Sequence, residues 1–444
     1  MSNTKIAANP LFYSAHNPFA FVCFFFLLSS ILQPSNQPAN YTGVSIKMHI
    51  LILGGTSFLG TALCAEAISR GHQVTLLNRG TKPAPMGTTS YVGDRTQPNG
   101  LDAIDGLTFD AVIDTWGRDP TPAIRAMEKL KGRTAHWTYT STISVYYQSP
   151  GTLGNGEKLN GEDTQLCEVV GPNCTKSVTS FHKRAVEVAA ENILRGTPTV
   201  FARMGIMSGP REASYIERSR MPWWLDRIRR GGPTLAPGPK EMKMQLIDVR
   251  DVAKFIIDGS EQKRNGPYNV CGNAGNITFG DFLESANELT GNHAEFVWAT
   301  PDEIAALQIR PFIELPLWVS PDHWEYATVY AWDNAKAVRA GLQMRPIQET
   351  IRDTWAWMTG DKPPVHAPRG VDLKLWRTLG MYPEKEAAAL RKLEIVRKGG
   401  SVSPPRSHHV VQTNGAPAVN GYHNPAHGGQ QEQHPDEIEM AKTR

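Results

Sequence analysis

The chain has 444 residues, of which 40% are hydrophobic and 20% are charged. This apolar fraction can bury a substantial core, which excludes a chain that is disordered throughout. The 46 basic and 43 acidic side chains leave a net charge of +3, so no strong positive field indicates nucleic acid as a partner. The five cysteines are scattered and form neither a disulfide framework nor a metal-binding pattern, which favours a reducing compartment. We therefore expect a cytoplasmic protein without a metal site.

The first 47 residues differ from the rest of the chain. Phe19–Leu32 is an apolar run, shorter than the ~20 residues that a membrane-spanning helix needs, so we expect no stable membrane insertion. Its length suits the core of a signal peptide, but Lys5 is the one basic residue before it and no clean cleavage site follows. We interpret residues 1–47 as a disordered or signal-like extension, with the secretory pathway as the alternative location.

A glycine-rich turn follows the first predicted strand. Met48–Leu53 is an apolar β-type run, a helical pattern ends at Gly71, and His72–Asn78 is a second β-type run. A strand, a glycine turn, a helix and a strand within about 30 residues are typical of dinucleotide binding. Glycines allow backbone N–H groups to approach the pyrophosphate, which the helix N-terminus attracts. The expected cofactor-binding residues of this turn are Gly54, Gly55, Thr56, Ser57, Phe58, Leu59 and Gly60.

The end of the second strand indicates which dinucleotide is bound. An acidic residue there would bind the ribose 2′-hydroxyl of NAD, whereas a nearby arginine favours the 2′-phosphate of NADP. The chain has Asn78 and Arg79 at this point and no acid. The sequence therefore favours NADP, with NAD as the alternative. Asp94, which follows a strand predicted at Thr89–Val92, is a candidate for contact with the adenine.

Strands and helices continue to alternate as far as residue 202. This alternation predicts an α/β fold with a doubly wound parallel sheet of the Rossmann type, in which ligands bind at the carboxyl ends of the strands. We assign the NAD(P)-binding domain to residues 48–205. The further predicted elements are strands at Phe109–Asp114, Thr134–Tyr139 and Thr197–Ala202 and helices at Pro122–Leu130 and Phe181–Leu194.

Five motifs, in order along the chain, resemble the extended and atypical short-chain dehydrogenase/reductase superfamily, and most of all its NAD-dependent epimerase/dehydratase group. The resemblance covers about Met48 to Met358 and implies the fold and the class of cofactor, but no particular substrate. The motifs are the glycine turn G-G-T-S-F-L-G, G-D-R at Gly93–Arg95, S-T-I-S-V-Y at Ser141–Tyr146, R-M-G-I-M-S-G-P at Arg203–Pro210 and I-D-V-R-D-V-A at Ile247–Ala253.

The resemblance also implies a catalytic hydroxyl, a tyrosine and a lysine four residues after the tyrosine. The hydroxyl falls on Thr142 and the lysine on Lys183, but Thr179 stands where the tyrosine is expected. None of the twelve tyrosines has a lysine four positions later. In the family, the lysine binds the nicotinamide ribose and lowers the tyrosine pKa, so that the phenol can pass a proton. An alkyl hydroxyl such as that of Thr179 cannot do this near neutral pH.

Three groups remain open as replacements for the missing proton donor. Tyr146 or Tyr147 lies at the end of a predicted strand, His182 has a side chain that titrates near neutrality, and bound water is the third choice. We retain Tyr146 beside Thr142 and Lys183 as a candidate catalytic residue. Lys183 is also a candidate cofactor-binding residue.

The resemblance implies that residues 206–360 form a small mixed substrate lobe that returns to the main domain. Eight of the eleven tryptophans lie in this region. We expect most of them to pack in a core, whereas Trp223 and Trp224 lie near charged residues and are candidates for an apolar substrate pocket.

The end of the chain is predicted to contain a linker, a helix and a tail. Asp361–Pro368 is rich in proline, and Val371–Arg397 has a strongly helical, amphipathic pattern. We expect this helix, within residues 361–397, to pack on the main domain or on a partner subunit. Residues 398–444 are rich in Gly, Pro, His and Gln and are predicted to be disordered.

The sequence favours an NADP(H)-dependent oxidoreductase that transfers hydride to or from a small carbonyl, imine or hydroxyl metabolite and lacks the usual tyrosine. One alternative is an NAD-dependent nucleotide-sugar epimerase or dehydratase, for which Arg203 and Arg250 are the two arginines in position to clamp a diphosphate. The other alternative is a non-catalytic cofactor-binding protein. The expected partner is the small-molecule substrate; a homodimer is compatible with the sequence, and no nucleic acid is expected.

Overall fold

A computed structural model describes residues 47–148, 159–169, 178–366 and 379–399. These residues all belong to one compact unit, Ile46–Arg444. Apart from Lys47, Lys398 and Gly399, the predicted N-terminal extension and C-terminal tail lie outside the described residues.

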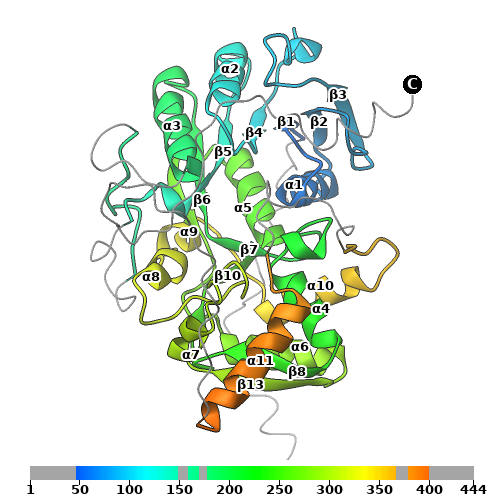
Figure 1. The fold of residues 1–444 in the computed structure, drawn as a ribbon. Coiled ribbons are helices and arrows are strands. Elements are labelled where there is room, and N and C mark those ends of the chain that lie inside the picture. Colours follow the sequence, from blue (N-terminus) through cyan, green and yellow to red (C-terminus); the bar gives the residue numbers. More distant parts are fainter. Residues whose placement is uncertain (1–46, 149–158, 170–177, 367–378, 400–444) are drawn as a thin grey trace, which may run out of the picture. The chain divides into compact units, whose positions relative to one another are not determined.

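The largest element of the unit is a sheet of seven parallel strands in the order β11-β6-β5-β4-β1-β2-β3 (Figure 1). The chain runs outward from β1 through β2 to β3, and then crosses back to β4 on the other side of β1. This order confirms the predicted doubly wound Rossmann-type fold. The strands are β1 (His49–Leu53), β2 (Gln73–Asn78), β3 (Thr88–Val92), β4 (Ala111–Asp114), β5 (Trp137–Thr142), β6 (Thr199–Met204) and β11 (Gly266–Val270).

Helices cover both faces of the sheet, which explains why β1 is apolar without a break from Ile50 to Leu53. Ile50 and Ile52 of β1 belong to a buried cluster with residues of α1 (Phe58–Ser69) and α5 (Val249–Glu261). Leu51 and Leu53 belong to a second cluster with residues of α2 (Thr121–Leu130) and α3 (Val178–Ile193). Successive side chains of a strand point to opposite faces, so a strand that is buried on both sides needs an unbroken apolar run.

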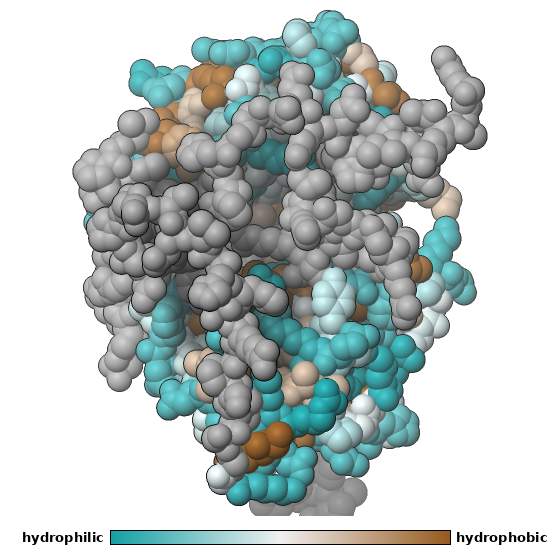
Figure 2. Space-filling model, viewed as in Figure 1, coloured by the Kyte–Doolittle hydropathy of each residue, from teal (hydrophilic) through white to brown (hydrophobic). Residues whose placement is uncertain are grey.

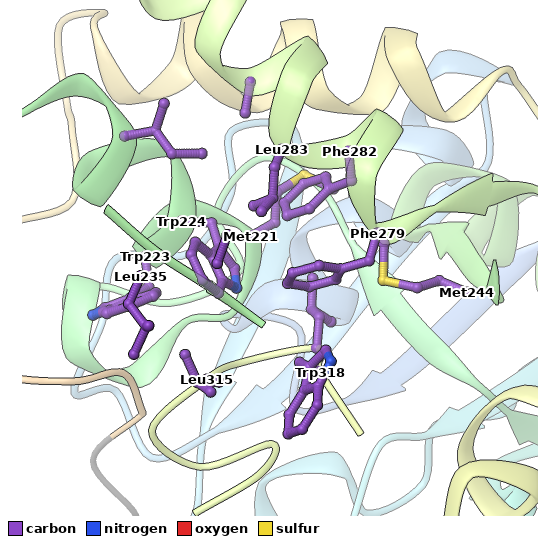
Figure 3. Packing of buried hydrophobic residues seen from close by; sticks show 14 of the residues in the cluster. Met221, Trp223, Trp224, Leu235, Met244, Phe279, Phe282, Leu283, Leu315 and Trp318 are labelled. Carbon is purple, nitrogen blue, oxygen red and sulfur yellow. The ribbon is translucent and has the colours of Figure 1, made fainter. Parts of the chain in front are cut away.

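A smaller lobe is built around the tryptophan-rich region. Its core includes Trp223 and Trp224, which are 4% and 0% exposed (Figure 3). The ring of Trp224 packs edge-on against Phe279 at 5.5 Å, and its Nε1 donates to the carbonyl of Pro316 at 2.5 Å. The prediction that these two tryptophans line a substrate pocket is therefore wrong, because both side chains fill the core of the lobe. The lobe contains α4 (Met221–Arg229), β8 (Gly232–Pro237), α6 (Phe279–Thr290), β13 (Ala294–Ala299), α7 (Pro301–Ala306) and α10 (Ile347–Met358).

Three two-stranded sheets and two short helices complete the region after residue 205. The strands β8 and β13 pair in parallel, as do β7 and β10, whereas β9 and β12 are antiparallel. From β10 the chain enters α5 and then β11, so these two elements return to the main sheet. The remaining elements are β7 (Ile206–Ser208), β9 (Lys243–Met244), β10 (Leu246–Asp248), β12 (Ile277–Thr278), α8 (Glu325–Tyr330) and α9 (Ala335–Arg339).

The last described helix is shorter than predicted. The sequence pattern indicated a helix over residues 371–397, whereas α11 spans Pro383–Arg397 and residues 379–382 are not helical; residues 371–378 lie outside the described residues. Ala389 and Leu393 of α11 belong to the core of the lobe. Glu386 accepts a hydrogen bond from Arg227 Nε at 2.5 Å and another from the backbone N–H of Leu235 at 3.1 Å. The helix thus packs on the lobe of its own chain.

The described surface visible in Figure 2 is mostly hydrophilic, with apolar residues in small separate spots. Within the described parts of the chain, no helix combines the length and the apolar character needed to cross a bilayer.

We expect Glu386→Ala to lower the free energy of unfolding by about 3 kcal/mol, because it leaves the buried guanidinium of Arg227 without its carboxylate. Urea unfolding measures the change. Glu394→Ala, on the same helix, removes an exposed carboxylate and is the control, with no measurable loss expected. Equal stability of the two variants would show that the buried ion pair does not hold α11.

Candidate cofactor and active site

The glycine turn leads from β1 into α1, and its three glycines stand at positions where a side chain would not fit. Gly54 and Gly55 have φ values of +119° and +93°, which L side chains rarely adopt. A Cβ atom on Gly54 would lie 2.4 Å from Thr115 Oγ1, and one on Gly60 would lie 2.7 Å from the Cα of Gly55. The helix therefore starts in direct contact with the turn.

The other predicted residues of the turn lie at the start of α1. Ser57 is the N-cap with an extended backbone, and its carbonyl accepts from the N–H of Thr61 at 2.7 Å. Leu59 points into the core cluster under the sheet, and Phe58 packs against that cluster. The first backbone N–H groups of a helix have no partner within it, so this end of α1 is suited to an anion such as a pyrophosphate.

Two arginines lie near each other at the carboxyl edge of the sheet. Arg79 follows β2 and is exposed. Burial, and then the nearby positive charge of Arg79, lowers the pKa of Arg118, which lies in the loop after β4. The side chain of Asn78 instead holds the backbone, because its Oδ1 accepts from the N–H of Gly80 at 2.8 Å. Like charges at close range are unfavourable unless an anion lies between them. Sequence reasoning found Arg79 and missed Arg118, since nothing in the sequence places the two loops together.

The predicted adenine contact Asp94 closes a turn after β3. Its Oδ1 accepts from the backbone N–H and the hydroxyl of Thr96, at 3.0 and 2.8 Å. The next residue, Arg95, makes a buried two-point ion pair with Asp114 at 2.7 and 2.8 Å. Asp114 ends β4 and also accepts from the N–H of Trp116 at 2.9 Å, so this pair fixes the loop that follows β4. Sequence reasoning did not predict this ion pair between Arg95 and Asp114, although Arg95 belongs to the G-D-R motif.

Lys183 lies at the carboxyl ends of β4 and β5. Its ammonium is buried and donates to the carbonyl oxygens of Trp116, at 2.7 Å, and of Thr140. It lies 4.7 Å from the centre of the Tyr139 ring. Among the described residues, no carboxylate lies within ion-pair distance of this ammonium. Burial lowers the pKa of Lys183 to about 8, although Asp114 and Glu187 oppose the shift.

Thr142 ends β5, the strand whose Thr140 carbonyl binds Lys183. Its Oγ1 accepts from the backbone N–H of Ser144 at 3.2 Å, and the side chain is partly exposed. Thr179, in the first turn of α3, is exposed. Tyr147 and His182 are both partly buried. The structure therefore brings Thr142 and Lys183 to the ends of neighbouring strands.

Tyr146 lies in the core rather than at an open site. Its phenol donates to Asn269 Oδ1 at 2.7 Å and accepts from Arg203 Nη1 at 3.0 Å, while its ring stacks on Trp332 at 4.8 Å. Burial raises the pKa of Tyr146 to about 12. A phenol that is fully buried and already bonded on both sides is badly placed to deliver a proton, so this geometry argues against the predicted catalytic role of Tyr146.

The two arginines considered as a diphosphate clamp are both used in internal ion pairs. Arg203 is buried and binds Glu187 through Nε at 3.1 Å and Nη2 at 2.9 Å. Arg250 binds Asp248 and Asp353, each at 2.7 Å. That interpretation is therefore corrected: neither guanidinium is held ready for a ligand. The described residues contain no group of three or more His, Cys, Asp or Glu side chains suited to a metal ion.

The doubly wound sheet and the glycine turn before α1, with the buried Lys183 at the same edge, are the features of a dinucleotide-binding fold of the short-chain dehydrogenase/reductase type. The chain belongs to the NAD dependent epimerase/dehydratase family, whose sequence profile matches residues 50–271.

Two characterised proteins are similar to parts of the chain. The chloroplast stem-loop binding protein of 41 kDa b from Arabidopsis thaliana is 25% identical over 263 residues, which are 53% of this chain and 62% of that protein. The 2-alkyl-3-oxoalkanoate reductase of Stenotrophomonas maltophilia is 29% identical over 230 residues, which are 47% of this chain and 64% of that protein. Each of these matches thus spans less than two thirds of the relative.

A solved structure of similar fold is that of the UDP-glucose 4-epimerase from Thermotoga maritima with UDP-glucose. It superposes with a TM-score of 0.55 at 17% identity and covers 70% of this chain and 98% of that chain. At this identity the likeness concerns the fold alone.

We expect Gly60→Ala to weaken NADPH binding by about tenfold or more, because the new Cβ would push α1 away from the backbone of Gly55. Quenching or enhancement of NADPH fluorescence on titration measures the affinity. Gly259→Ala in α5 is the matched control, since its new Cβ would meet its nearest atom at 3.9 Å and affinity should not change. Unchanged binding in both variants would remove the glycine turn as the cofactor site.

Proposed function

We propose that this protein is an NADP(H)-dependent oxidoreductase that transfers hydride to or from a small carbonyl, imine or hydroxyl metabolite. The observation that carries the proposal is the buried ammonium of Lys183, fixed by Trp116 and Thr140 at the edge where the glycine turn ends. A bound nicotinamide would supply the hydride. The remaining steps fall to residues of this chain, which bind, orient and exchange protons.

Each group at the carboxyl edge has a role that its position supports. The start of α1 would hold the pyrophosphate, and the ammonium of Lys183 would hold the nicotinamide ribose. The hydroxyl of Thr142 would hydrogen-bond the oxygen or nitrogen of the substrate. Arg79 and Arg118 would bind the 2′-phosphate of NADP, whose negative charge relieves the repulsion between the two guanidinium groups.

The proton donor is assigned to a group other than Tyr146. Tyr147, His182 and bound water remain open, and Thr179 has no accessible pKa near neutrality. A nucleotide-sugar epimerase is disfavoured because Arg203 and Arg250 are committed to carboxylates of the same chain. The threonine at position 179 favours, as a second candidate, a cofactor-binding protein without turnover. If reductase activity were found in Thr179→Tyr and in no other form, this second candidate would replace the first.

We expect Arg79→Ala and Arg118→Ala each to weaken NADPH binding by about 10- to 100-fold and to change NADH binding little, because each removes a charge-assisted contact with the 2′-phosphate. Parallel titrations with the two dinucleotides give the ratio. Lys131→Ala, which removes an exposed charge after α2, is the control. Equal losses for NADPH and NADH would contradict the assignment of these arginines.

We expect Lys183→Met to lower kcat/KM for NADPH oxidation on the order of 100-fold with a panel of aldehydes, ketones and cyclic imines. In the native enzyme, activity should fall as pH rises above about 8, because deprotonation removes the positive charge that binds the ribose. Lys183→Arg keeps a positive charge at alkaline pH and should bind NADPH without this decline. A native protein that does not change NADPH fluorescence, or full activity in Lys183→Met, would refute the proposal.

A further inference from the structure

A hollow of about 560 Å³ lies away from the glycine turn, between α5, β11 and the end of α9. Lys254 and Asp258 of α5, Arg264 before β11, and Arg339 at the end of α9 contribute to its lining. Arg264 lies at the amino end of the sheet, since its carbonyl is 3.0 Å from Nε2 of His136, the residue before β5. The glycine turn and Lys183 lie at the carboxyl end, so the length of a strand, about 17 Å, separates the two places.

The charges that line this hollow are unbalanced. Three cationic side chains face one carboxylate, and that carboxylate is already bound twice. Asp258 accepts from Arg70 Nη1 at 2.7 Å and from Lys254 Nζ at 3.0 Å. A fourth cation is close by, because the ammonium of Lys336 lies 4.6 Å from the ring of Tyr268, which also lines the hollow. The region therefore carries an excess of positive charge on a chain whose net charge is only +3.

The guanidinium of Arg264 has no carboxylate within ion-pair distance among the described residues, although the residue is only 9% exposed. It donates to Gln262 Oε1 at 3.2 and 3.0 Å and to the carbonyl of Phe255 at 3.2 Å, and it lies over the Phe255 ring. These three bonds leave two of its five N–H groups without an acceptor in the described part of the chain. Burial lowers the pKa of Arg264, although the charges of Asp258 and Glu261 oppose the shift.

We propose that this hollow is a second binding site, which takes a small phosphate-bearing metabolite through Arg264, Arg339 and Lys254. A planar guanidinium presents parallel N–H donors that match two phosphate oxygens, and an ammonium adds a point charge. A dianion suits the site better than a monocarboxylate because more than one positive charge lacks a counterion. The volume is that of a site for a small organic molecule. The cations are grouped around one hollow, which favours a small ligand over the backbone of a nucleic acid.

Gly341 keeps the guanidinium accessible. It has a φ of +98°, and a Cβ atom at this position would lie 3.3 Å from Nη2 of Arg264. A side chain here would cover the face of Arg264 on which Nη2 lies.

The test is calorimetric titration of the full-length protein with inorganic phosphate, at constant ionic strength set with sodium chloride and with NADPH at saturation. We expect saturable binding that Arg264→Gln weakens by about tenfold or more and that Arg339→Gln weakens severalfold. Arg352→Gln removes an exposed arginine of α10 and is the matched control, with no change expected. Arg79→Ala should also leave phosphate binding unchanged, which separates this site from the cofactor site.

The outcomes remain distinguishable if the proposed function fails. Without NADPH binding, the titration is read from the effects of Arg264→Gln and Arg339→Gln alone. If Arg264→Gln is destabilised in thermal unfolding, the exposed Arg339 still decides the result. The proposal would be overturned if the native protein did not bind phosphate. It would also be overturned if Arg264→Gln and Arg339→Gln both bound phosphate as tightly as the native protein. An RNA hairpin that binds more tightly than phosphate and loses affinity in Arg339→Gln would replace the small ligand by nucleic acid.

Discussion

The contact between the backbone of Gly55 and the start of α1 is the constraint on which the rest of the site depends. Because Gly60 has no side chain, the helix begins against the turn, and the positive φ values of Gly54 and Gly55 direct the chain from the strand into that helix. This arrangement places the free N–H groups of α1 at the carboxyl edge of the sheet. The crossover from β3 to β4 opens the same edge beside β1, so the cofactor site and the groups around Lys183 share one side of the fold.

Internal ion pairs occupy three of the arginines that the sequence motifs contain. Arg95 is bound to Asp114, Arg203 to Glu187 and Arg250 to Asp248, so each of these guanidinium groups serves the structure. Arg79 and Arg118 have the opposite character, because each lies near another positive charge. A buried charge is tolerated when a partner compensates its desolvation. Under the proposed function, Arg79 and Arg118 bind the 2′-phosphate of NADP instead.

The chain keeps the family's fold with a threonine at position 179, and under the proposed function this residue changes the source of the proton. Lys183 still lies at the ends of β4 and β5, where it binds two carbonyl oxygens, yet the phenol that normally works beside it is absent at Thr179. Tyr146 does not fill this place, since Arg203 and Asn269 hold its hydroxyl in the core. We therefore propose that the site binds a dinucleotide and takes its proton from a group other than the family's tyrosine.

The sequence by itself determined the fold class and the glycine turn after β1, because both depend on local patterns. Apolar runs such as that of β1 and glycines at fixed spacing act within a few residues of one another, so they can be recognised without a structure. The tertiary structure alone decided which side chains meet. It brought the charge of Arg79 near Arg118, buried Trp223 and Trp224 in the lobe and closed Tyr146 into the core. It also left Arg264 without an ion pair to any carboxylate of the described residues. These outcomes depend on contacts between segments far apart in the chain, and burial and charge at such contacts cannot be read from spacing.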